Sequence, residues 1–150
     1  MMNSLYLYHA TGKENLDSIK KNGLLVNPPS HTETDDPYRE GKIFLAFDAQ
    51  AACDYAEVSE QFDEVAVLKV KLENLDPYAF GYDENNLCDS FDMINSCIYM
   101  KDIPAEALQE CSPDKEPELN FEDFEGTAVF EIVSDAFYTN NEVYKEDDER

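Results

Sequence analysis

Two kinds of secondary structure meet within the segment LYLYHATGKE (5–14), and the fold class follows from this segment. Residues 5–9 alternate aliphatic and aromatic side chains, which is typical of a β-strand. Thr11 and Glu14 have the spacing of a capping box, in which a threonine and a glutamate three residues later close the first turn of a helix. The sequence therefore predicts a strand that runs directly into a helix, and we expect that helix to end at Asn22 and Gly23.

The rest of the chain continues this mixture of strands and helices. Apolar runs at 42–47, 65–72, 96–101 and 127–133 predict four further strands. Asp48 is placed to cap an alanine-rich helix after the first run, and Lys69 in the second run is expected to point outward. We therefore predict one α+β domain over residues 1–144, followed by an acidic tail at 145–150.

Residues 26–41 separate the first helix from the next strand and have a different composition. They contain three prolines and four acidic residues with few aliphatic side chains. This composition predicts a long irregular surface loop, a kind of segment that is often functional in compact domains. Whether the loop closes over a ligand, and whether His31 joins a site, is left open.

The composition narrows the class of protein. With 150 residues, of which 43% are hydrophobic, the chain can bury one ordinary core. The sequence has neither a membrane-spanning apolar run nor a signal-peptide pattern, so we expect a cytoplasmic protein without membrane contact. The four cysteines form no CxxC pair and the two histidines are isolated, so we expect reduced thiols and no metal.

Charge sets the kind of partner that we expect. The chain carries 34 acidic and 11 basic residues, a net charge of −23, and residues 102–150 hold 16 of these acids and 3 of the bases. A surface of this sign repels phosphate groups, which argues against direct nucleic-acid binding. It favours a basic protein surface as the partner, whereas the oligomeric state is left open.

Three segments together resemble the ADP-ribosyltransferase superfamily, in the branch of the poly(ADP-ribose) polymerases and diphtheria toxin. They are YHAT (8–11), GKIFLA (41–46) with Tyr55, and NSCIY (95–99), and they occur in the order that the family uses. The resemblance covers residues 5–110. It implies a split antiparallel β-sheet with flanking helices and NAD as the substrate.

The resemblance also implies roles for individual residues. His9 would hold a ribose hydroxyl of NAD, the backbone of Ala10 would grip the nicotinamide carboxamide, and Thr11 completes this part of the cofactor site. Phe44 and Tyr55 have the eleven-residue separation of the family's aromatic pair, and would enclose the nicotinamide ring. Taken alone, His9 is better interpreted as a strand-end histidine satisfied by a neighbouring carbonyl, and both aromatic rings as ordinary packing residues. The order of the segments and the aromatic spacing favour the site.

One departure from the family concerns catalysis. The family's catalytic glutamate corresponds to Ser96, whose neutral hydroxyl does not supply the negative charge that stabilises the transition state. Catalytic roles for His9, Tyr55 and Ser96 therefore require a further acid, and Asp89, Asp92 and Glu106 are the candidates that sequence position offers.

Three functional hypotheses follow. The first is a mono-ADP-ribosyltransferase-like domain that transfers one ADP-ribose unit from NAD to a protein, with NAD hydrolysis as a related activity. The second is a non-catalytic interaction or inhibitor protein on the same fold, whose acidic surface mimics nucleic acid. The third is a different α+β domain, in which His9 and Tyr55 would lie far apart.

Overall fold

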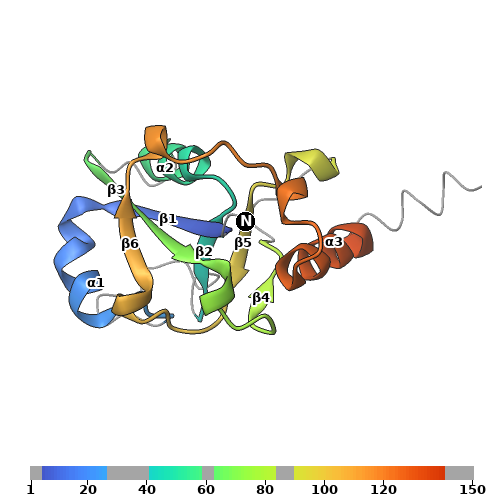
Figure 1. Cartoon of the computed structure of the whole chain (residues 1–150), viewed down its shortest axis with the longest axis horizontal. Coiled ribbons are helices and arrows are strands. Elements are labelled where there is room, and N and C mark those ends of the chain that lie inside the picture. The colour runs from blue at the N-terminus through green and yellow to red at the C-terminus, as the bar shows by residue number, and fades with distance from the viewer. Residues whose placement is uncertain (1–4, 27–40, 59–62, 84–89, 141–150) are drawn as a thin grey trace, which may run out of the picture.

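The computed structural model describes residues 5–26, 41–58, 63–83 and 90–140, which form an α+β arrangement (Figure 1). Within these residues a six-stranded antiparallel sheet has the strand order β4-β5-β2-β1-β3-β6. Its strands are β1 (Tyr6–Gly12), β2 (Ile43–Ala46), β3 (Val65–Lys71), β4 (Phe80–Gly81), β5 (Ser96–Tyr99) and β6 (Leu108–Cys111). The α-helices are α1 (Leu16–Asn22), α2 (Ala49–Val58) and α3 (Ala128–Asn140).

The centre of the sheet is weakly joined. Seven residue pairs connect β1 with β3, and four connect β2 with β5. Between β1 and β2, in contrast, the described part of the chain has the single pair Tyr8 and Ala46. The sheet therefore consists of two ladders that meet at one position.

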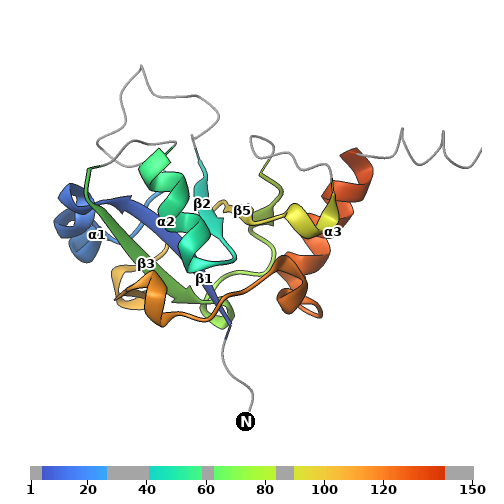
Figure 2. The same ribbon diagram turned by 90° about the horizontal axis from the view of Figure 1, so that it is seen from above.

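Each face of the sheet buries its own apolar cluster. The larger cluster includes Leu7, Leu45 and Cys97 together with Val129 and Val133 of α3. The smaller cluster lies under α2, whose small alanine side chains let the helix pack closely on Tyr8, Ala46 and Val67. Figure 2 shows α2 beside β2 and α3 on the far side of β5, so the two helices cover different parts of the sheet.

Several sequence predictions are confirmed. The apolar runs at 42–47, 65–72 and 96–101 contain β2, β3 and β5, and α2 follows Asp48. The Asp48 Oδ2 atom accepts a hydrogen bond from the Ala51 amide at 3.2 Å, as a capping carboxylate does. Helix α1 ends before Gly23, whose φ of 79° is in the left-handed region that glycine tolerates.

Two predictions about local structure are wrong. The run at 127–133 begins helix α3 and is not a strand, because its apolar residues continue at helical spacing through Val129, Val133 and Phe137, all buried. The capping box at Thr11 is absent, because β1 continues through Gly12 and a short 3-10 turn precedes α1. The Thr11 hydroxyl instead accepts a hydrogen bond from the side-chain Nδ2 of Asn15 at 2.9 Å.

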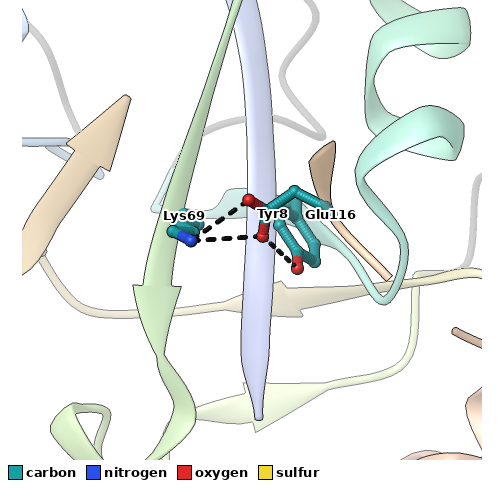
Figure 3. A network of polar contacts seen from close by, with 3 residues as sticks. All are labelled: Tyr8, Lys69 and Glu116. Atoms are coloured by element: carbon teal, nitrogen blue, oxygen red, sulfur yellow. Dashed lines mark hydrogen bonds and ion pairs between the residues drawn. The ribbon is translucent and has the colours of Figure 1, made fainter. Parts of the chain in front are cut away.

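Lys69 does not point outward as predicted. Its ammonium group lies 3.1 Å and 3.2 Å from the two carboxylate oxygens of Glu116, and the Tyr8 hydroxyl donates to the same carboxylate at 3.0 Å (Figure 3). The ammonium group also lies over the Tyr6 ring. Burial and the Glu116 carboxylate raise the pKa of Tyr8 well above its usual value, so the phenol remains a donor.

In the described parts of the chain, no helix is both long enough and apolar enough to cross a membrane.

Candidate functional site

Beyond the pair of Tyr8 and Ala46, the described residues of β1 and β2 form no further residue pair, and we call this break in the pairing the opening between the two ladders. Hydrogen-bond directions show which backbone groups face it. The Lys13 amide donates to the Glu64 carbonyl at 3.0 Å, which continues the β1–β3 ladder past the end of the strand. Since successive residues of an antiparallel strand direct their backbone groups to alternate sides, the odd-numbered residues of β1 face β3. The backbone groups of Tyr8 and Ala10 therefore face β2.

The same argument fixes the direction of β2. The Phe47 amide donates to the Asn95 carbonyl at 3.0 Å, so odd-numbered residues of β2 face β5. The backbone groups of Phe44 and Ala46 consequently face β1. Ala46 uses this direction in its pair with Tyr8, and a continued ladder would next pair Phe44 with Ala10.

The His9 side chain bonds the Phe44 carbonyl that this next pair would use. Its Nδ1 atom lies 2.9 Å from the Phe44 carbonyl oxygen, and because a carbonyl only accepts hydrogen bonds, Nδ1 carries the proton. In the neutral ring Nε2 is then an acceptor. The Ala10 amide and carbonyl are directed into the opening between β1 and β2, where they lie beyond the single pair that joins the strands.

The two predicted aromatic residues come from the side of the sheet that α2 covers. Phe44 is half-buried and lies two residues before Ala46, so alternation puts its side chain on the same face as Ala46 and α2. Tyr55 lies on α2 between the buried residues Ala52 and Ala56, with half of its own surface exposed. An exposed tyrosine ring next to a packed helix face is available to stack on a planar ligand.

Ser96 begins β5 and pairs directly with Ala46. Its hydroxyl donates to the Asp83 Oδ2 atom at 3.2 Å, and Asp83 is only 7% exposed. The three segments singled out in the sequence thus lie on three neighbouring strands, with His9 on β1, Phe44 on β2 and Ser96 on β5.

Asp83 is a residue that the sequence did not single out. It follows β4, a strand of two residues whose pairing with β5 leaves no recognisable pattern in the sequence. Glu106, which was a candidate acid, is exposed in a turn beyond the opposite end of β5 and near α1. Asp89 and the side chain of Asp92 lie outside what the structure describes.

The loop predicted at 26–41 is described only at its two ends. The Gly41 amide donates to the Val26 carbonyl at 3.1 Å, and the Val26 amide donates to the Asp102 carboxylate at 2.8 Å. The ends of the loop are therefore held together immediately before β2. His31 lies outside the described residues.

Within the described residues, the remaining reactive side chains form no second candidate centre. No group of three or more histidine, cysteine, aspartate or glutamate side chains in the described residues is arranged to hold a metal ion. Cys53, Cys97 and Cys111 are free, and burial raises the pKa of Cys53 and of Cys111 to about 11. Such thiols are poor nucleophiles at neutral pH.

No protein-family model matches this sequence, and no curated protein matches it either.

Proposed function

We propose that this chain is an ADP-ribosyltransferase-like domain that binds NAD and transfers a single ADP-ribose unit to a protein. The observation that carries the proposal is the opening between β1 and β2, where the His9 ring bonds the Phe44 carbonyl and the Ala10 backbone faces β2. The resemblance implies a split between central strands, and the single pair between β1 and β2 supports the proposal on this point.

The opening offers the polar groups that a nicotinamide requires. An amide and a carbonyl on one residue match a primary carboxamide as a neighbouring strand would, so Ala10 would bind the nicotinamide carboxamide. His9 Nε2 would accept a hydrogen bond from a ribose hydroxyl. Phe44 and Tyr55, both on the side that α2 covers, would enclose the pyridinium ring, while buried Thr11 supports the end of β1.

The acceptor in this proposal is a basic protein surface. The net charge of −23 steers cationic partners toward the domain and repels nucleic acids. His9 and Ser96 both lie in the sheet. Because water can replace the protein acceptor in the reaction, slow hydrolysis of NAD is the catalytic activity to measure first.

Calorimetric titration of NAD into the protein tests the proposal without knowledge of the acceptor. We expect saturable binding that is lost in His9→Ala and in Tyr55→Ala. Tyr78→Ala is the matched control, because Tyr78 is a tyrosine with 90% of its surface exposed and lies in the turn before β4. No heat at millimolar NAD, or equal binding by all variants, would refute an NAD site here.

A second candidate is the non-catalytic acidic interaction protein. The observation in its favour is that, apart from Glu116, every acidic side chain in residues 102–140 is exposed, whereas Lys115 is the one basic residue of that segment. Binding to a basic protein that is salt-sensitive and unchanged in His9→Ala, together with no NAD binding, would favour this candidate.

A further inference from the structure

We propose that Ser96 and Asp83 act as a relay that supplies the negative charge lost with the family's glutamate. Ser96 would contact the ribose of NAD, and Asp83 would position and polarise Ser96. This inference rests on the proposed function, because it assigns the groups that would drive cleavage of the bound NAD.

Strand register places the two residues side by side. In the β4–β5 ladder Phe80 pairs with Tyr99 and Gly81 with Ile98, and continuing that register puts Asp83 opposite Ser96. The hydroxyl-to-carboxylate distance of 3.2 Å is consistent with this placement. Ser96 in turn pairs with Ala46, and Ala46 pairs with Tyr8, so that Asp83 lies at one end of a row of paired residues across β5, β2 and β1. Tyr8 is the residue before His9.

The surroundings of Asp83 strengthen its electrostatic effect. Only 7% of the Asp83 residue surface is exposed, and charges act more strongly where water is excluded. The neighbouring Cys97 thiol is fully buried, and burial together with the Asp83 charge raises the pKa of that thiol. Cys97 therefore remains neutral and does not compete for the role of the acid.

The direction of the hydrogen bond gives Ser96 its function. A carboxylate only accepts hydrogen bonds, so the Ser96 hydroxyl donates to Asp83, and a hydroxyl oxygen that donates can also accept. A ribose 2′-hydroxyl could then donate to the Ser96 oxygen. The negative charge of Asp83 reaches the sugar through two consecutive hydrogen bonds, which is one more bond than a glutamate at position 96 would need.

The reaction balances with water as the acceptor. The bond between the ribose C1′ and the nicotinamide nitrogen breaks, its electron pair goes to that nitrogen, and neutral nicotinamide leaves. The positive charge develops on the ribose ring, where the Asp83 charge stabilises it through Ser96. A water oxygen then bonds to C1′ and its proton is released to solvent, giving ADP-ribose.

The experiment measures nicotinamide release from NAD and NAD binding in parallel, for five proteins. They are the unmodified chain, Asp83→Asn, Ser96→Ala, the double variant Asp83→Asn with Ser96→Glu, and Asp114→Asn. Asn is close in size to Asp, so Asp83→Asn removes charge with little change in packing. Asp114→Asn is the matched control, because it removes one negative charge from an exposed turn.

We expect kcat to fall about a hundredfold in Asp83→Asn and in Ser96→Ala, with KM and calorimetric affinity within about threefold of the unmodified chain. Asp114→Asn should behave as the unmodified chain does. The double variant should recover at least about tenfold of the lost kcat, since the introduced carboxylate would deliver its charge directly. A merely structural role for Asp83 would not predict a fall in kcat with unchanged KM and affinity.

The outcomes separate the relay from the proposed function. No NAD binding by the unmodified chain overturns both. NAD binding with no nicotinamide release by the unmodified chain, or with equal release by Asp83→Asn, overturns the relay and leaves the NAD site intact. If Asp83→Asn fails to fold by circular dichroism, unchanged kcat in folded Ser96→Ala overturns the relay, and a selective fall in its kcat supports it.

Discussion

Lys69 shows at the scale of a single residue how a position that resembles a surface lysine becomes part of the interior. Lys69 alternates with apolar residues in β3. Its anionic partner is Glu116, which the fold brings to the same face of the sheet. Sequence separation hides such a partner, because Glu116 lies 47 residues later. The Lys69 and Glu116 side chains are 20% and 9% exposed, so their attraction is only partly screened by water.

Lys69→Met should therefore destabilise the protein by about 2 kcal/mol, somewhat less than the loss seen for fully buried pairs. The cause is that Glu116 would remain largely buried with Tyr8 as its donor and without a cation. Urea denaturation followed by circular dichroism measures the change. Lys71→Met, two residues later on the same strand, is the control and should shift stability by less than about 0.5 kcal/mol. Equal stability of the two variants would contradict the role of the ion pair.

At the scale of elements, the sequence predicts those segments whose local signal and tertiary role agree. Strands β2, β3 and β5 are apolar runs bounded by turn residues, and α2 has both a capping aspartate and a buried alanine face. The sequence does not predict strands β4 and β6, because β4 has two residues and β6 has exposed polar residues at its centre. The strand predicted at residues 127–133 is wrong because a short run of β-branched and aromatic residues fits a strand as well as the start of a buried helix.

The junction after α1 gives a test of tertiary packing around an element's end. Any Cβ at Gly23 would overlap the Ile103 carbonyl oxygen, where the chain passes close to the Leu24–Ile103 bridge. Gly23→Ala should thus destabilise by more than about 3 kcal/mol, through left-handed strain together with a backbone clash. Gly126→Ala is the matched control, since Gly126 has a φ of 91° and no described atom within 4 Å of the added Cβ.

Thermal unfolding of both glycine variants separates the two causes. Strain alone should cost Gly126→Ala about 1 kcal/mol, and the difference between the variants reports the clash. If Gly23→Ala were as stable as Gly126→Ala, residues 103–105 would be able to move away from α1 without a loss of folding free energy, and the predicted clash would be contradicted.

At the scale of the whole molecule, the candidate site divides into a part that sequence order reveals and a part that only the sheet reveals. His9, Phe44 and Ser96 could be selected in advance because the three short segments that contain them resemble those of one family and occur in the same order. The opening beside Ala10 and the Asp83 carboxylate could not, since both depend on which strands pair and where that pairing stops. Register is set by contacts across the whole chain, and sequence spacing alone does not encode it.

The net charge of −23 is itself a property of the whole molecule with a measurable consequence. Mutual repulsion among the exposed carboxylates opposes the compact state, and salt screens that repulsion more in the folded chain, where the charges lie closer together. Raising NaCl from about 10 mM to about 500 mM, where the Debye length falls from about 30 Å to below about 5 Å, should raise the melting temperature by several degrees. KCl at the same ionic strength is the control, because screening does not distinguish the two cations. Screening also weakens the Lys69–Glu116 pair, so a melting temperature that falls with salt would mean that specific ion pairs outweigh repulsion in this fold.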